Sequence, residues 1–363
     1  CVAWICAALF GSWPYGLCDP GLPFPVAFFE SVSGFTTTGA TTIEDLDLFP
    51  DSILLWRALT QWLGGIGIVV MFVAVLSFLG VGSRSLMQHE SSVNISEGTR
   101  ARISDLAATL LKVYVGLTVV CALGLWWLGM TLFEAVTHSF TTIATGGFST
   151  HNVSIEYYQN LAIEVWLALF MLLGGVSFML YVFVASGNWK RLKQEEEAKF
   201  YILILIASTI LISLNLWLSE STESYPEALK KCFFTIVSLS TSTGYANEDY
   251  DQWPVFSKWI LLILMFIGGC AGSTAGGLKM NRIILFMKVA AQELVKSFRP
   301  EQVFSLKLNG QQLDADIRSR TTFYLVLAAF IWLVGAVIFS LLEPPMDLQT
   351  SIGTVTAMMF NIG

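Results

Sequence analysis

Four short polar runs that end in glycine recur along this chain of 363 residues, each within an otherwise apolar stretch. They are Thr36-Thr37-Thr38-Gly39, Ala144-Thr145-Gly146-Gly147, Thr241-Ser242-Thr243-Gly244 and Phe360-Asn361-Ile362-Gly363. Glycine lets the backbone adopt a positive φ because no Cβ obstructs it, so several carbonyl oxygens can converge on one axis. Converging carbonyls can replace the water shell of an alkali cation. Four such loops could therefore ring one ion pathway.

The hydroxyl groups in these runs admit two interpretations. In a membrane helix, Ser and Thr often bond back to their own backbone. Recurrence of the run before a glycine and a new apolar span favours the other interpretation, in which backbone carbonyls, with or without a hydroxyl, line ion sites. The candidate ion-binding residues are Thr37, Thr38, Gly39, Thr145, Gly146, Gly147, Ser242, Thr243, Gly244, Asn361, Ile362 and Gly363.

The composition places the chain in a membrane. Hydrophobic residues make up 55% and charged residues only 13%, which is far from the usage of soluble domains. Apolar runs at 54–79, 106–130, 161–185, 200–218 and 321–342 each reach the roughly 20 residues that cross a bilayer as a helix. Residues 1–16 are too few for a span and begin without methionine, so we expect them to be the tail of a truncated span.

An internal repeat organises these spans. Each unit reads as a span, a loop with a short apolar segment, a glycine-ended run and a second span, and a glycine pair marks the second span at Gly64, Gly174 and Gly268. The intervals from run glycine to glycine pair are 25, 27 and 24 residues (39 to 64, 147 to 174, 244 to 268). This regularity predicts four repeats at 1–80, 81–187, 188–300 and 301–363, the third with a broken second span and the first and last truncated.

A turn or cap signal precedes each glycine-ended run. The signals are Pro23 and Pro25, Thr131, Ser224 with Pro226, and Pro344-Pro345 before Asp347. The segment that follows each signal is too short to cross a membrane. It predicts a pore helix that dips in and returns as extended chain, which is tolerated at membrane depth only when buried in protein or facing water. The negative end of its dipole would then favour a cation.

The charges predict an orientation. Basic residues gather in loops without glycine-ended runs: Arg84, Arg100, Arg102, Lys190, Arg191, Lys193, Lys199, Arg282, Lys288, Lys296, Arg299 and Lys307. The loops with the runs carry Asp19, Glu30, Glu44, Asp45, Asp47, Asp51, Glu220, Glu223, Glu248, Asp249 and Asp251. By the positive-inside rule the filter mouth lies outside and the basic loops are cytoplasmic. An acidic mouth raises the local cation concentration. We expect the chain to contact the lipid bilayer and to bind no nucleic acid.

Residues 254–294 stay apolar for about twice the length of one crossing, and ten small residues, Gly268 to Gly277, interrupt them. Glycine costs on the order of 1 kcal/mol in a helix interior, so five glycines favour a break. A flexible loop that occludes ions and a close-packing face between helices both fit these residues. A phosphate-binding loop does not, because the Gly-Lys-Ser/Thr ending is absent.

These motifs together resemble the Trk/Ktr/HKT superfamily of potassium transporters, and within it the bacterial Trk membrane subunit. The resemblance rests on Gly34 to Thr42, Gln61 to Gly67, Ala144 to Ser149, Ser242 to Tyr245, Gly268 to Gly277 and Asn361 to Gly363, which cover the chain from end to end. It implies an all-α polytopic membrane protein with four pseudo-repeated M1-P-M2 units around one central pore, the potassium-channel architecture in a single chain.

The resemblance also implies roles and partners. One filter glycine per repeat falls on Gly39, Gly147, Gly244 and Gly363, and glycine rather than serine at the first position favours potassium. The intramembrane gate falls on Gly269, Cys270, Ala271, Gly272, Ser273, Thr274, Ala275, Gly276, Gly277 and Lys279. Family members form homodimers in the bacterial plasma (inner) membrane and sit on a cytosolic nucleotide-binding (TrkA-like) regulatory ring. The only metal implied is K⁺, as the transported ion at the filter residues, with no cofactor in the chain.

Two departures accompany the resemblance. The chain stops at Gly363, before the fourth repeat's second span and the basic residue that the family carries there. The family's first hairpin and most of its first M1 helix are also missing. We therefore expect the sequence to be part of a longer protein.

Two alternatives to a gated potassium pathway remain. A potassium/proton or potassium/sodium symporter needs a titratable or second-ion site at membrane depth, and the sequence offers no clear one. A polytopic membrane enzyme needs ionisable residues inside the spans, but Arg57, Glu164 and Lys279 fall near span ends. We therefore predict no catalytic residues and no enzyme activity.

Overall fold

The computed structural model describes residues 2–78, 97–185, 187–299, 307–308, 311–312, 315–342 and 347–363. The four longest helices are α4 (Asp51–Phe78), α6 (Glu97–Trp127), α11 (Glu196–Leu218) and α15 (Ala315–Leu342). Shorter helices are α1 (Val2–Gly11), α2 (Trp13–Leu17), α3 (Phe24–Phe35), α7 (Leu132–Ile143), α8 (Leu161–Gly175), α9 (Phe178–Ala185), α10 (Trp189–Gln194), α12 (Tyr225–Ser240), α13 (Val255–Ile267), α14 (Met280–Phe298) and α16 (Leu348–Phe360).

Little else in the described residues is regular structure. Three short 3-10 helices occupy Leu46–Leu48, Ser154–Tyr158 and Tyr250–Gln252. The strands β1 (Lys307–Leu308) and β2 (Gln311–Gln312) form a two-residue antiparallel hairpin. The predicted all-α architecture is therefore confirmed, with this hairpin as a small addition.

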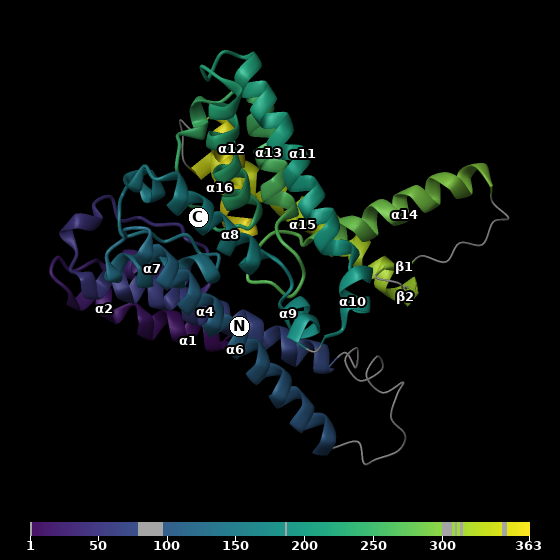
Figure 1. Cartoon of the computed structure of the whole chain (residues 1–363), viewed down its shortest axis with the longest axis horizontal. Helices are drawn as coiled ribbons and strands as arrows, with labels where there is room; N and C mark the ends of the chain where they lie inside the picture. Colours follow the sequence, from purple (N-terminus) through teal and green to yellow (C-terminus); the bar gives the residue numbers. More distant parts are fainter. Residues whose placement is uncertain are drawn as a thin grey trace.

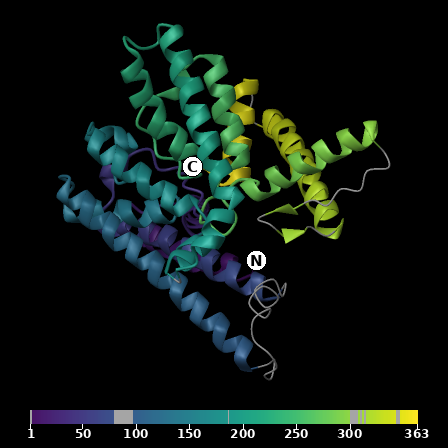
Figure 2. The ribbon, with the colours of Figure 1, turned by 45° about the vertical axis from the view of Figure 1, so that its right-hand side comes forward.

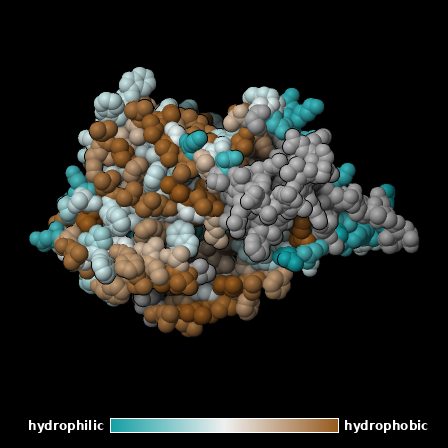
Figure 3. Space-filling model, turned by 90° about the horizontal axis from the view of Figure 1, so that it is seen from below, coloured by the Kyte–Doolittle hydropathy of each residue, from teal (hydrophilic) through white to brown (hydrophobic). Residues whose placement is uncertain are grey.

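Among the described residues, four helices are long and apolar enough to cross a membrane: Asp51–Met71, Asp105–Trp127, Glu196–Leu218 and Asp316–Leu342. Only 6% of the last of these is buried inside the protein. Brown apolar side chains cover much of the face in Figure 3. A helix that is apolar on its exposed side needs lipid rather than water around it, so the chain is a polytopic membrane protein.

The short helices α3, α7, α12 and α16 begin at the predicted signals. Thr131 and Glu134 form a capping box at the start of α7, and the Asp347 side chain accepts from the Thr350 N–H at the start of α16. Pro23 and Ser224 are the N-caps of α3 and α12. The Thr131 and Asp347 side chains accept from N–H groups of the first helical turn, whereas Pro23 and Ser224 make no side-chain cap and a proline in the first turn removes a free N–H instead. Pro344 and Pro345 lie outside the described residues.

The span predicted at 161–185 is not one helix. It divides into α8 and α9, which are bent by 88° at Val176-Ser177. The break leaves carbonyls without helical partners, and the Gly175 and Gly174 oxygens accept from the N–H groups of Cys270 and Thr274. Sequence periodicity missed the break because its partners lie about a hundred residues away.

The predicted break at 254–294 is confirmed. Helix α13 ends at Ile267, α14 begins at Met280, and residues 268–279 between them contain no helix. We call these residues the 268–279 segment. Gly268, Gly272 and Gly277 have φ values of 66°, 74° and 81°, which glycine adopts readily.

Each short helix packs against the long helix of its own unit: α3 on α4, α7 on α6, α12 on α11 and α16 on α15. Each second span also packs against the next unit's short helix, through the pairs α4–α7, α8–α12 and α13–α16. The chain's C-terminus lies at the centre of the molecule in two views, while α14 projects outward (Figure 1, Figure 2).

The exact division into repeats stays a prediction. The boundaries at 80–81 and 300–301 fall on residues outside the described part of the chain. The same holds for Arg84 and for the side chains of Arg100, Arg102 and Arg191.

Candidate functional site

The four glycine-ended runs share one backbone conformation. We call residues 36–39, 144–147, 241–244 and 360–363 the first to fourth glycine loops. Two residues before the final glycine of each, the chain is left-handed: φ is 60° at Thr37, 51° at Thr145, 56° at Ser242 and 63° at Asn361. The glycines of the first three loops then have φ of 86° (Gly39), 77° (Gly147) and 84° (Gly244).

Each loop leaves its helix through the same hydrogen bond. The N–H groups of Thr38, Gly146, Thr243 and Ile362 donate to the carbonyls five residues earlier, at 2.9, 2.8, 2.9 and 2.8 Å. This bond closes a Schellman motif, whose left-handed position usually holds glycine. Threonine there is costly, on the order of 1–3 kcal/mol, and such strain gathers at functional sites. The left-handed residue at the end of each helix therefore sets the direction in which the loop leaves it.

The loops meet in a closed ring. A Cβ placed on Gly39 would lie 2.0 Å from the Gly146 oxygen, and one on Gly147 would lie 1.9 Å from the Thr243 oxygen. On Gly244 it would lie 2.5 Å from the Gly363 oxygen, and on Gly363 it would lie 2.3 Å from the Gly39 carbonyl carbon. The predicted residues of all four loops are thus brought together, and glycine is needed because neighbouring backbones touch there.

Asn361 joins the fourth glycine loop to the first. Its amide nitrogen donates to the Thr36 carbonyl at 2.9 Å, and its oxygen accepts from the Thr38 hydroxyl at 2.6 Å. The fourth loop is therefore fastened to the first across the whole length of the chain.

Some hydroxyls in the loops bond to their own backbone. Thr145 donates to the Ala144 carbonyl and Ser242 to the Thr241 carbonyl, both at 2.7 Å. At these two positions the local interpretation of the hydroxyl applies. The backbone carbonyls are the oxygen ligands that all four loops have in common.

The 268–279 segment contacts three of the four loops or the helices that lead into them. Thr274 donates its hydroxyl to the Ile143 carbonyl at 3.0 Å, just before the second loop. The Gly276 N–H donates to the Ser242 hydroxyl in the third loop, and the Gly277 N–H donates to the Phe360 carbonyl in the fourth at 3.0 Å. The segment therefore lies directly against the ring.

Glu197 on α11 bonds both the 268–279 segment and the first turn of α14. Its Oε1 accepts from the Ala271 N–H at 2.6 Å and from the Asn281 N–H at 3.0 Å, and the residue is only 5% exposed. The ammonium of Lys279 donates a hydrogen bond to the Ala275 carbonyl inside the segment. Glu197 was not among the predicted site residues, because its partners come from a distant stretch of chain.

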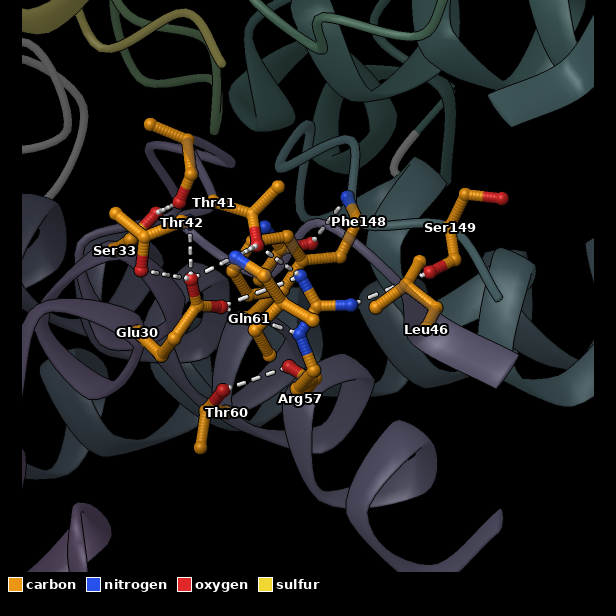
Figure 4. Close-up of polar contacts among 12 residues, drawn as sticks. Glu30, Ser33, Thr41, Thr42, Leu46, Arg57, Thr60, Gln61, Phe148 and Ser149 are labelled. Atoms are coloured by element: carbon orange, nitrogen blue, oxygen red, sulfur yellow. Dashed lines mark hydrogen bonds and ion pairs between the residues drawn. The ribbon is translucent and has the colours of Figure 1, made fainter. Parts of the chain in front are cut away.

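A buried ion pair lies behind the first two loops (Figure 4). Arg57 on α4 and Glu30 on α3 approach to 3.3 Å and are 1% and 0% exposed. The sequence placed Arg57 near a span end, which agrees with its position near the start of Asp51–Met71, but it placed Glu30 in an acidic mouth, which is wrong because Glu30 is fully buried on α3. The available signal was an arginine within an apolar span, since such a residue needs a partner.

Glu134 stabilises the N-terminal start of α7. Burial raises its pKa, but hydrogen bonds from Thr131 and from His151, at 2.9 Å, outweigh burial and lower the pKa of Glu134 to about 2. His138 joins the same region, because its Nε2 lies 3.0 Å from the Ser149 hydroxyl. These contacts link α7 to the chain that leaves the second loop.

Comparison with known proteins adds the family. The cation transport protein family TrkH matches residues 2–363. The Trk system potassium uptake protein TrkH of Salmonella typhimurium LT2 is 37% identical, and the match covers 99% of this chain and 75% of that protein. TrkH of Escherichia coli K12 shows the same identity and coverage.

A solved structure agrees with the fold. The crystal structure of the potassium transporter TrkH from Vibrio parahaemolyticus superposes with a TM-score of 0.88 at 34% identity, covering all of this chain and 75% of that one. Since the family match and the relatives span nearly every residue, this chain belongs to the TrkH family of cation transport proteins.

Proposed function

We propose that the chain forms a potassium uptake pathway with a selectivity filter at the ring of glycine loops. The observation that carries the proposal is the ring itself, in which four loops of one conformation touch through glycine. K⁺ would shed water among the carbonyls of the filter residues named from the sequence, which run from Thr37 to Gly39, Thr145 to Gly147, Ser242 to Gly244 and Asn361 to Gly363. The named potassium function of the relatives supports this substrate.

The 268–279 segment is proposed as the gate. It lies against three parts of the ring and contains small residues from Gly269 to Gly277, with Lys279 at its end. K⁺ passes when the segment moves aside. A cytosolic nucleotide-binding ring controls that movement, the protein works as a homodimer in a bacterial inner membrane, and the filter mouth faces outside. These last assignments rest on the family resemblance and on the loop charges.

The first experiment measures rubidium or potassium uptake into proteoliposomes that carry the full-length protein, with sodium in competition and only a potassium gradient imposed. Selective, saturable uptake supports the pathway. Flux that requires an imposed proton or sodium gradient would instead favour the symporter.

A filter substitution tests the site. Gly244→Ser adds a side chain where a Cβ lies 2.5 Å from the Gly363 oxygen. The two loops must separate, so the preference for K⁺ over Na⁺ should fall about tenfold, equivalent to about 1.4 kcal/mol. An unchanged preference would contradict the filter assignment.

A further inference from the structure

One face of α4 carries two fully buried polar side chains a single turn apart. Arg57 is 1% exposed and Gln61 is 0% exposed, within a span that is otherwise mostly apolar. Burying a polar group away from water is unfavourable unless it is hydrogen-bonded. Both side chains therefore need partners, and both find them on the chain around the second glycine loop.

Gln61 holds the backbone on both sides of Gly147. Its Nε2 donates to the Gly146 carbonyl at 2.7 Å, and its Oε1 accepts from the Phe148 N–H at 3.1 Å. A Cβ on Gly146 would lie 2.4 Å from the Gln61 Cδ, so glycine at 146 leaves room for this amide. The Gly146 oxygen keeps a second lone pair after accepting this bond.

Arg57 holds the next residues of the same loop. Its guanidinium lies 4.1 Å from the centre of the Phe148 ring, and Nη1 donates to the Ser149 carbonyl at 3.5 Å. A cation over an aromatic face is attracted to the ring. Figure 4 shows Arg57 and Gln61 reaching the second loop from the same helix.

Glu30 extends this support to the first loop. Its Oε1 accepts from the Thr42 N–H at 2.7 Å and from the Thr41 hydroxyl at 2.8 Å, while its other oxygen pairs with Arg57. A continuous line of hydrogen bonds thus joins the chain after the first loop to the chain after the second.

We propose that Gln61 is a positioning residue for potassium selectivity. It fixes the separation of the Gly146 carbonyl from the Phe148 N–H and so the place of Gly147 in the ring, with Arg57 and Glu30 holding Phe148 behind it. The inference rests on the proposed filter. The positions of the carbonyl oxygens decide which ion's water shell they can replace. A second glycine loop that has lost its hydrogen bonds to Gln61 should therefore admit Na⁺ more readily.

The test uses the full-length protein in proteoliposomes and compares rubidium uptake with its inhibition by sodium. Gln61→Met keeps a similar volume and removes both hydrogen bonds, whereas an ionised Gln61→Glu keeps the acceptor for Phe148 but turns its second oxygen toward the Gly146 carbonyl. Asn215→Leu is the matched control, because it removes a different interhelical bond, from the Ser257 hydroxyl at 2.8 Å. Gly244→Ser reports on the filter itself.

Gln61→Met and Gln61→Glu should each lower the K⁺/Na⁺ preference by roughly tenfold, since both lose the bond to the Gly146 carbonyl, while Asn215→Leu lowers thermal stability but leaves the preference unchanged. If Gln61→Met cannot be recovered, Gln61→Glu decides on the same ratio. Preserved preference in the recovered Gln61 variant, alongside a loss in Gly244→Ser, would overturn this inference alone. Preserved preference in both would overturn the filter assignment as well.

Discussion

At single residues, the ring glycines are constrained by the neighbouring backbone more than by their own helices. Gly147 is the tightest, since an added Cβ meets the Thr243 oxygen at 1.9 Å while φ is 77°. Backbone cannot yield as a side chain does. Replacing a ring glycine therefore requires the adjacent loop to shift, and that shift displaces the next loop in turn.

Gly147→Ala should reduce potassium uptake more than Gly244→Ala, because the added methyl groups approach to 1.9 and 2.5 Å. A strained left-handed residue adds on the order of 1–3 kcal/mol. We expect at least a tenfold loss of uptake for Gly147→Ala. Gly116→Ala on α6 is the control: nothing lies within 4 Å of its Cβ, so uptake should persist and stability should rise by up to about 1 kcal/mol. Equal effects at 116 and 147 would refute the argument.

Glu134 predicts an acid response. Its folded pKa of about 2 lies below the ordinary 4.5, so its stabilisation is full above pH 4.5 and is lost as the pH falls toward 2. Glu134→Gln should cost about 1 kcal/mol at pH 7 and show a smaller loss of stability between pH 5 and pH 3 than the parent. Thermal unfolding in nanodiscs at several pH values measures this, with the exposed Glu223→Gln as a control. Parallel pH curves for parent and Glu134→Gln would argue against it.

At the scale of elements, the two broken spans complement each other. The break between α8 and α9 frees the Gly174 and Gly175 carbonyls, and the 268–279 segment supplies the N–H groups that bond them. Buried backbone groups must be paired, so neither break would be stable alone. These hydrogen bonds hold the 268–279 segment against the ring. Because the segment is not helical, it can move by exchanging hydrogen bonds, without unwinding a helix.

The sequence revealed one of these breaks and not the other for a physical reason. Five glycines in ten residues cannot sustain a helix, so the interruption between α13 and α14 was predictable. The pair Gly174-Gly175 is also compatible with a continuous helix. Its bend is decided by hydrogen bonds to Cys270 and Thr274, which no local pattern encodes. The same limit hid the pairing of Glu30 with Arg57, while the glycine loops were visible because their conformation is local.

Glu197→Ala should loosen the 268–279 segment. It removes the acceptor of two N–H groups, on the half-buried residues Ala271 and Asn281, and leaving each unpaired costs up to about 1–3 kcal/mol. The segment in contact with the ring is then less stable, so potassium flux without the regulatory partner should rise several-fold. Glu197→Gln keeps an acceptor oxygen and should change flux little. Flux assays in proteoliposomes measure this, with Glu196→Ala as the neighbouring control; unchanged flux in Glu197→Ala would leave Glu197 as a packing residue.

At the scale of the whole molecule, the loop charges predict an orientation in the membrane that two exposed residues can test. Glu223 directly precedes α12, whereas Lys193 lies in α10, shortly after α9. Both residues are exposed. Since positive residues favour the cytoplasm, the two positions should lie on opposite sides of the membrane.

Cysteine labelling tests this orientation. In intact cells, a membrane-impermeant thiol reagent should label Glu223→Cys and not Lys193→Cys, and permeabilisation should make Lys193→Cys reactive. The parent chain is the blank, because Cys6 is exposed and Cys18 half-buried. The orientation also matters for transport, because acidic loops that face outside raise the cation concentration near the ring. Added salt should weaken this attraction, because exposed charges are screened within about 10 Å at 0.1 M. Labelling of Lys193→Cys in intact cells would reverse the orientation, and the acidic loops would then face the cytoplasm rather than the ion source.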